Sequence, residues 1–281
     1  MALPTTAVVT DSTADFAGVT PNDYGITVVP LTVNWGQEVL RDKNDVTTEE
    51  FYERRRSDRV LPKTAAPPIG IFEDLYRSLL TEHETVISIH IAAKLSATYS
   101  VALAAAHSIA PDRIHVVDSE TVSVGVGWLA EAAATLAGSQ TPATEILEEL
   151  RHMIPRLRLH LTLETLEYLA RGGRIGRARA FLGGILNVKP ILEVRESEIH
   201  PVERVRNRAA SIRRVAQLVH QLGPKERVAV LHGDCAAEAE PLRAHFAELE
   251  GLSNVPMAEI GSVLGTHAGP GVIGIGCILA P

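Results

Sequence analysis

Short apolar runs alternate with segments of helical length over roughly the first half of the chain. The stretches at residues 6–12, 85–92 and 114–120 have the composition of buried strands that end in polar turns. Helical spacing is found at residues 69–80 and 96–110, and two more helices are predicted to follow. Alternation of this kind predicts a mostly parallel sheet covered by helices.

Two further elements are predicted between the first strand and the first of these helices. ITVVPLTVNW, residues 26–35, has the composition of a strand, and Pro30 must interrupt it because proline has no backbone N–H to donate. TTEEFYERRRSD, residues 47–58, begins with Thr47 followed three residues later by Glu50, which is the pattern of a helix capping box. This pattern predicts a helix that begins near Thr47.

The pattern restarts near Pro155 with a larger share of strands. Further elements are expected as strands at 157–165, 227–233, 257–260 and 272–279, two strands joined by a Glu-Ser turn within 189–205, and helices at 207–222 and 236–250. A chain of 281 residues is long for a single hydrophobic core. We therefore expect two α/β domains, residues 1–154 and 155–281.

Charge and composition restrict the classes of partner. The net charge of −7 and an aromatic content of only 4% do not favour extensive binding of nucleic acid. Positive charge is concentrated between Arg171 and Arg214, where eleven Lys/Arg and four Asp/Glu give a local charge of +7. An acidic surface or a phosphate is the natural partner of such a patch. The apolar residues are mainly aliphatic, which is compatible with an aliphatic cavity and equally with an ordinary core.

Within this patch, RGGRIGRARAF at residues 171–181 could bind a phosphate, contact nucleic acid or dock a protein. It lacks the Lys-Ser/Thr pair of a phosphate-binding P-loop, which weakens the first interpretation. The overall negative charge weakens the second. We interpret the stretch as a glycine turn that leads into a basic helix start and forms a docking patch.

Cysteine usage and the chain ends indicate a cytoplasmic protein. Cys235 and Cys277 lie in apolar, strand-like contexts without metal-ligand spacing, so we expect two buried free thiols and no metal site. No basic segment followed by an apolar run marks a signal peptide. No apolar stretch of about 18 residues predicts a membrane span.

Polar residues that suit an anion follow several of the predicted strands. Thr64 lies in an extended segment held by prolines, and Ser96 and Thr98 begin a predicted helix, where hydroxyls and free N–H groups can hold an anion. The glycine-rich stretch GTHAGPG places His267 in a loop, where it could donate to an anion or exchange protons. Ser96 could equally be a plain helix cap, and His267 a loop residue without a role.

Two aspartates follow strands in the same way. Asp11 and Asp118 could serve acid–base chemistry or bind Mg²⁺, but Asp and Ser are also the usual residues of turns and helix caps. The sequence contains no P-loop, no GxSxG elbow, no HExxH and no CxxC. These residues could form an anion site, but no recognisable catalytic motif accompanies them.

Several stretches, in order over essentially the whole chain, resemble the DegV family. They are VTDSTADF, LPKTAAPP, KLSATY, VVDSETVSVGVGWLA, LETLEYLARGGRIGRARAFLGGILNVKPILEV and THAGPGVIGIG, and the fifth is the most specific. The resemblance implies two α/β domains that bury one long-chain fatty acid in a tunnel between them. It implies no cofactor beyond that ligand and no catalytic centre.

The resemblance also implies partners. Family members of this kind present the fatty acid carboxylate to a separate ATP-dependent fatty acid kinase, and the acyl-phosphate product goes on to an acyltransferase of phospholipid synthesis. Such a role allows transient contact with a membrane and requires no nucleic acid.

Residue by residue, the resemblance assigns the fatty acid carboxylate to Thr64, Ser96 and His267, together with Thr98 and the Ala93 position. It assigns kinase docking to Arg174, with Arg204 or Arg206 in a second basic element. The chain has Ala65-Ala66, Ala92-Ala93 and Ala97 where the family has Ser-Gln, Ser-Ser and Gly. These replacements predict fewer side-chain hydrogen bonds to the head group, each worth about 1.5–3 kcal/mol when the partner is charged.

Two other classes of function stay open on the residues alone. A small hydrolase or phosphotransferase could use His267 with Asp11 or Asp118. A regulatory protein could bind DNA or RNA through the arginine-rich stretch, and such binding would weaken steeply with salt.

Overall fold

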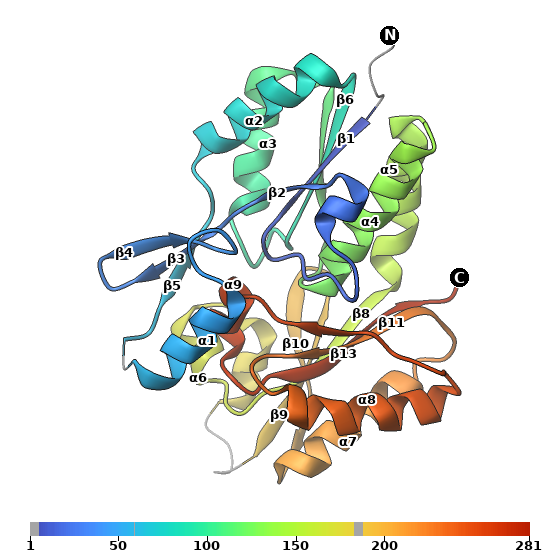
Figure 1. Cartoon of the computed structure of the whole chain (residues 1–281). Helices are drawn as coiled ribbons and strands as arrows, with labels where there is room; N and C mark the ends of the chain where they lie inside the picture. The colour runs from blue at the N-terminus through green and yellow to red at the C-terminus, as the bar shows by residue number, and fades with distance from the viewer. Residues whose placement is uncertain (1–5, 59, 183–187) are drawn as a thin grey trace.

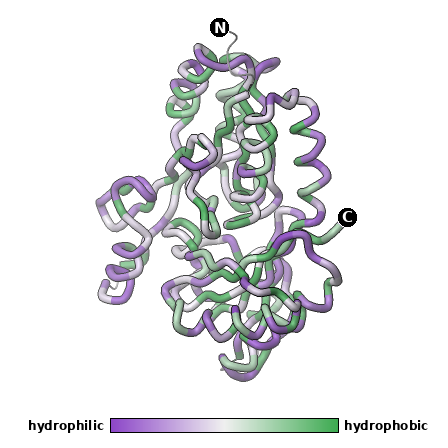
Figure 2. Tube along the Cα trace, turned by 45° about the vertical axis from the view of Figure 1, so that its right-hand side comes forward, coloured by the Kyte–Doolittle hydropathy of each residue, from purple (hydrophilic) through white to green (hydrophobic). Residues whose placement is uncertain are grey.

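A computed structural model describes residues 6–58, 60–182 and 188–281. Its architecture is two sheets, one above the other, with helices outside and between them (Figure 1). Part of the arginine- and glycine-rich stretch used for the family resemblance, residues 183–187, lies outside the described residues. Figure 2 shows hydrophobic stretches along the strands in the middle of the molecule and hydrophilic stretches on the outer helices.

The first sheet is fully parallel, in the order β2-β1-β6-β7. Its strands are β1 (Thr6–Asp11), β2 (Thr27–Val29), β6 (Thr85–His90) and β7 (Ile114–Asp118). Helices α2 (Ile69–Glu82) and α3 (Thr98–Ile109) cover one face through a cluster that includes Phe72 and Tyr76. The parallel sheet predicted from the alternating pattern is confirmed in this part of the chain.

The second sheet is mostly antiparallel, in the order β10-β9-β8-β13-β11-β12, with only the β11–β12 pair parallel. Its strands are β8 (Leu157–Thr162), β9 (Lys189–Arg195), β10 (Glu198–Val205), β11 (Lys225–His232), β12 (Met257–Glu259) and β13 (Ile273–Leu279). Helices α7 (Arg208–His220) and α8 (Ala236–Glu250) cover its outer face. The expected Glu196-Ser197 turn joins β9 to β10, and both residues have positive φ, as a two-residue hairpin requires.

Helix α4 (Val124–Gly138) passes between the two sheets, and α5 (Ala143–Met153) packs against α4. Helix α4 contacts β1 and β6 of the first sheet and β8 and β13 of the second. Close packing on β13 depends on glycine, because a Cβ on Gly276 would lie 2.7 Å from Val124 Cγ2. One apolar core therefore continues from the first sheet through α4 into the second.

A small antiparallel sheet, β4-β3-β5, branches from the first part of the chain. It consists of β3 (Thr32–Trp35), β4 (Glu38–Arg41) and β5 (Lys63–Ala65), and it was not predicted from the sequence. Pro30 does interrupt the expected strand at 26–35, but its two halves, β2 and β3, join different sheets. Helix α1 (Thr48–Ser57) has the expected capping box at Thr47 and Glu50.

Helix α1 and the small sheet pack against α9 (Ser262–Ala268), which comes from the last part of the chain. The Tyr52 hydroxyl of α1 donates to the carbonyl of Ile260 at 3.0 Å. The remaining short helices include η1 (Pro21–Tyr24), α6 (Glu167–Arg171) and η3 (Gly176–Phe181). The chain passes from α5 to β8 through η2 (Ile154–Arg156), and the boundary between domains 1–154 and 155–281 stays a prediction.

Candidate functional site

An apolar cavity lies between the second sheet and the loops that follow strands of the first. The centre of a water molecule can occupy about 130 Å³ of it. Its aliphatic lining comprises Leu31, Ile91, Leu95, Val122, Leu159, Leu161, Leu163, Leu169, Leu192, Val194, Ile199, Leu231, Ile260, Val263 and Leu264, with Ala65, Ala66, Ala97 and Ala268. No Phe, Tyr or Trp ring lines it among the described residues, so most of its wall is aliphatic.

The alternating pattern of β8 explains one wall. Leu159 and Leu161 of β8 are spaced by two residues and therefore share one face of the strand, and Leu163, directly after the strand, also lines the cavity. The register places Leu159 opposite Val194 and Leu161 opposite Leu192 on β9. These side chains form a continuous aliphatic surface toward the first sheet.

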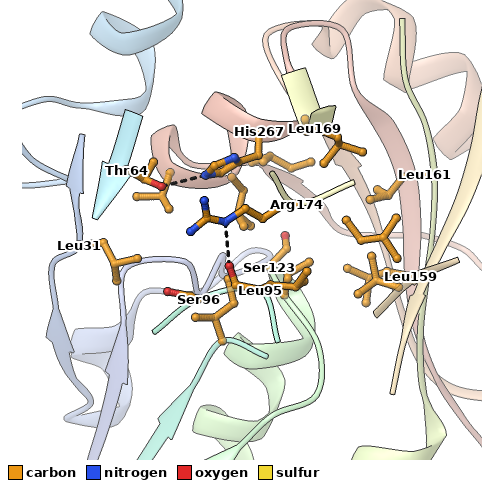
Figure 3. Close-up of a pocket in the computed structure, with 18 of the residues that line it drawn as sticks. Leu31, Thr64, Leu95, Ser96, Ser123, Leu159, Leu161, Leu169, Arg174 and His267 are labelled. Carbon is orange, nitrogen blue, oxygen red and sulfur yellow. Dashed lines mark hydrogen bonds between the residues drawn. The ribbon is translucent and has the colours of Figure 1, made fainter. Parts of the chain in front are cut away.

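Polar side chains gather at one side of this cavity (Figure 3). Thr64 Oγ1 and His267 Nε2 are 2.8 Å apart, and the Arg174 guanidinium lies beside them. Arg174 donates from Nε to the carbonyl of Leu95 at 3.1 Å and from Nη1 to the carbonyl of Gly172 at 2.7 Å. No carboxylate of the described residues pairs with Arg174, and its Nη2 makes no hydrogen bond within that part of the chain. The cavity thus has one cationic, hydrogen-bonding edge.

Local structure brings these groups together from three distant segments. Thr64 lies on β5, directly opposite Val33 of β3. His267 lies in the last turn of α9, so the loop predicted around it is wrong: residues 262–268 form a helix, and the glycine-rich loop begins only at Gly269. The glycines around His267 had suggested a loop because glycine has a low helix propensity. The close packing of α9 against its neighbours outweighs that local preference.

Glycine also lets His267 approach the segment that carries Arg174. A Cβ on Gly172 would lie only 2.2 Å from His267 Nδ1, so no other residue fits there without a shift. Gly173 has φ of +71°, a left-handed conformation that turns the chain after α6 toward Arg174. The predicted glycine turn in this stretch is confirmed, and its basic continuation is the short helix η3.

The environment of His267 keeps its ring neutral. Burial, and next the nearby charge of Arg174, lower the pKa of His267 to about 4. Its Nδ1 is buried and has no hydrogen-bond partner in the described structure. At neutral pH the edge therefore carries one positive charge, on Arg174, and a neutral imidazole.

Of the other residues predicted to bind the fatty acid carboxylate, only one lines the cavity. Ser96 lines the cavity and bonds to Thr98 through their hydroxyls at 2.9 Å. Thr98 is fully buried and does not line the cavity. Its hydroxyl can therefore hold the Ser96 hydroxyl in position, but it does not itself face the cavity. Ala93 does not line the cavity either, and its N–H already donates to Asp118 Oδ1 at 3.1 Å.

One cavity residue was missed in the sequence and one was assigned a different role. Ser123 lines the cavity and donates to the buried Asp15 at 2.7 Å; it lies in the stretch VVDSETVSVGVGWLA, from which no residue had been assigned to the site. Arg174 was expected in a docking patch separate from the head-group site, whereas its guanidinium lies beside Thr64 and His267. The arginine-rich motif and the histidine motif therefore meet at one site.

The two candidate catalytic aspartates are not near His267. Asp11 is fully buried and accepts from the backbone N–H groups of Thr13 and Ile91 and from His90. Asp118 accepts from the N–H groups of Ala93 and Glu120. Neither aspartate lines the cavity, so the structure does not bring together the acid–base pair that a hydrolase or phosphotransferase would need.

The second basic element lies on β10. Arg204 is exposed and its guanidinium lies 5.1 Å from the ring centroid of Phe181, and Arg206 is also exposed. Arg177, in the arginine-rich stretch, is paired with Glu198 at 2.6 Å. The positive charge of this surface is thus partly neutralised, while Arg204 and Arg206 have no carboxylate partner within the described ranges.

Cys277 is buried and Cys235 partly buried, and both are free thiols, so the expectation of full burial is wrong for Cys235. No helix in the described ranges is both long and apolar enough to cross a bilayer. Those ranges also contain no cluster of three His, Cys, Asp or Glu side chains that could hold a metal ion.

The fold and the cavity define a class of α/β proteins with two stacked sheets that can enclose an apolar ligand with one anionic end. The chain belongs to the DegV family: the profile of this family, described as one of uncharacterised proteins, matches residues 5–280. The expected family and α/β fold class are confirmed.

Relatives cover almost the whole chain. Protein DegV of Bacillus subtilis is 35% identical in an alignment of 278 positions that covers 96% of this chain and 97% of that protein. A fatty-acid-binding DegV family protein from Thermus thermophilus is 31% identical, with a TM-score of 0.89 over 98% of this chain and 100% of that chain. A stearic-acid-binding protein from Eubacterium ventriosum is 26% identical, with a TM-score of 0.89 over 97% of each chain.

We predict that the His267 ring stays neutral between about pH 5.5 and 8, because its pKa is lowered to about 4. The unfolded ring, with an ordinary pKa near 6.5, binds a proton that the folded ring excludes, so this group destabilises the fold as the pH falls from about 6.5 toward 4. NMR titration of the imidazole signal, assigned with a His267→Asn variant, measures the pKa. In Arg174→Gln the pKa should rise, and a wild-type midpoint between about 6 and 7 would contradict this account.

Proposed function

We propose that this protein binds one long-chain fatty acid in the aliphatic cavity, with its carboxylate at the edge formed by Thr64, Ser96, Arg174 and His267. The observation that carries the proposal is the cavity itself: a smooth aliphatic interior with one cationic, hydrogen-bonding edge. Fatty acid binding by relatives of the same fold supports it.

The hydrogen bonds at the edge suit a carboxylate. His267 Nδ1 has no partner, and a buried N–H without an acceptor costs more than an unpaired lone pair, so we assign the proton to Nε2. Nε2–H then donates to Thr64 Oγ1, and the Thr64 hydroxyl is free to donate its own proton to the carboxylate. The free Nη2 of Arg174 supplies a charged donor.

The acyl chain supplies most of the affinity in this account. Each buried CH₂ contributes roughly 0.8 kcal/mol, so a long chain contributes about 10 kcal/mol or more. The head group then has to be oriented rather than held strongly, which fits a site with alanines at Ala65, Ala66 and Ala97 on its wall.

We further propose that the carboxylate is presented to a separate ATP-dependent kinase. In that step a carboxylate oxygen forms a bond to the γ-phosphorus of ATP, the bond from that phosphorus to the β–γ bridging oxygen breaks, and ADP leaves. A downstream acyltransferase would consume the acyl-phosphate. The family resemblance and the separation of Asp11 and Asp118 from His267 support a binding subunit over an enzyme.

We predict that the purified protein carries one fatty acid that native mass spectrometry detects, and that organic extraction removes it. Thr64→Val should weaken retention about tenfold or more, because the donor to the carboxylate is lost. Thr32→Val, on the paired strand β3 and outside the cavity lining, is the matched control and should retain the lipid.

No lipid mass, together with no binding after delipidation, would refute the proposed function. Unchanged retention in Thr64→Val would instead remove Thr64 from the head-group site.

We predict that docking to the kinase depends on Arg204 and Arg206, which are exposed and lie outside the cavity lining. The double variant Arg204→Glu/Arg206→Glu should retain fatty acid but form much less acyl-phosphate when the cognate kinase and ATP are added. Arg174→Glu cannot separate the two roles, because it would place a negative charge beside the carboxylate. Wild-type product formation by the double variant would exclude this surface.

A further inference from the structure

A broad groove lies on another part of the molecule, lined by side chains from α4, α5, β11 and β13. Its polar lining includes Trp128 and Glu131 of α4, Glu145 and Glu149 of α5, and Glu226 and Arg227 of β11, and we call it the acidic groove. The centre of a water molecule can occupy about 690 Å³ of it. The acidic groove has no described lining residue in common with the aliphatic cavity, so the two are separate spaces.

Negative charge dominates this groove. Its lining carries four glutamates and, among the described residues, one cation, Arg227. Glu226 is paired with Arg156 at 2.5 Å. Glu145 and Glu149 are exposed, make no ion pair within the described ranges and lie one helical turn apart, where like charges repel each other. A cation beside these two side chains would relieve that repulsion.

Glu131 is the buried glutamate of the groove. Its side chain is only 3% exposed, and its Oε2 accepts from Nη2 of Arg227. The Arg227 guanidinium lies 5.3 Å from the ring centroid of Trp128, which holds it on that side of the carboxylate. Glu131 Oε1 is buried and has no hydrogen-bond partner in the described structure. Because a buried carboxylate oxygen without a donor is unfavourable, a donor from outside the chain would stabilise the groove at this atom.

Apolar side chains complete the lining. Leu136, Met153 and Ile278 belong to it, and the ring of Tyr24, which is 36% exposed, adds an aromatic face. Methylene groups can pack on such a surface, and an ammonium group can lie over an aromatic ring. The groove therefore combines several separate negative charges with apolar surface.

We infer that the acidic groove binds a linear aliphatic polyamine, with one ammonium group at Glu131 Oε1 and another at Glu145 and Glu149. A compact ammonium suits the single free oxygen of Glu131, whereas a guanidinium fork matches two oxygens. The methylene spacers of the polyamine pack on the apolar lining. The inference does not rest on the proposed function, because the groove and the cavity are separate.

The same lining does not suit a divalent metal ion. Such an ion requires several oxygen ligands that converge on one point. Over the described residues, no three His, Cys, Asp or Glu side chains gather in that way. Separate carboxylates instead match separate ammonium groups that are joined by a flexible chain.

The test is calorimetric titration of spermidine into the purified full chain at low ionic strength. Glu145→Gln/Glu149→Gln should weaken spermidine binding about tenfold or more, because one ammonium group loses both of its charged acceptors. Both side chains are exposed, so the fold does not depend on them. Glu131→Gln, at the buried end, should also weaken binding.

Glu82→Gln/Glu148→Gln is the matched control. It removes the same number of charges, and both glutamates are exposed and lie outside the groove lining, with Glu148 on the same helix α5. This variant should bind spermidine within about twofold of the wild type, since exposed charges outside the site are screened. An equal loss in the control variant, or no loss in Glu145→Gln/Glu149→Gln, would overturn the inference.

Two further outcomes concern the class of ligand. Butylamine or Nα-acetyl-lysine amide that binds as tightly as spermidine would make the groove a site for a single ammonium group, such as a lysine side chain of a partner, and would overturn the polyamine assignment. A wild-type chain that binds no spermidine would also overturn it. Hexadecanoic acid binding, measured in parallel, should be the same in all these variants, so a failure of the proposed function is seen separately.

Discussion

The hydrogen bond between Thr64 and His267 joins two segments that are 203 residues apart in the chain. It holds the small sheet, through β5, against the last turn of α9, and it closes one side of the aliphatic cavity. Burial and the charge of Arg174 keep the histidine neutral, with its pKa lowered to about 4, so the contact persists near neutral pH. The site that we propose for the carboxylate depends on this contact.

The same edge separates two environments of opposite character. On one side lie aliphatic side chains from β8, β9 and the loops of the first sheet, and on the other lies a second pocket lined by Arg55, Lys63 and Arg171. A molecule with a long apolar chain and an anionic end fits both at once. In our proposal the acyl chain lies in the cavity and the carboxylate lies at this edge, in contact with Arg174.

Much of this fold could be predicted from the sequence because its signals are local. Alternation of strands and helices predicted the parallel sheet, and the capping box at Thr47 predicted the start of α1. The small sheet could not be predicted, since β3 pairs with β5 only after the chain has passed through α1. The helix around His267 was missed because Gly265, which had suggested a loop, reflects close packing of α9 against Tyr52.

The candidate site could likewise be predicted only where the signal is local. Thr64 and His267 were recognised as separate motifs, but nothing local indicates that Arg174 contacts the same cavity.

A crystal structure with an ω-brominated fatty acid tests the central claim most directly. The account predicts a bromine anomalous peak inside the aliphatic cavity and the carboxylate about 3 Å from Thr64 Oγ1. A bromine peak outside that cavity, or a carboxylate that contacts neither Thr64 nor Arg174, would contradict it.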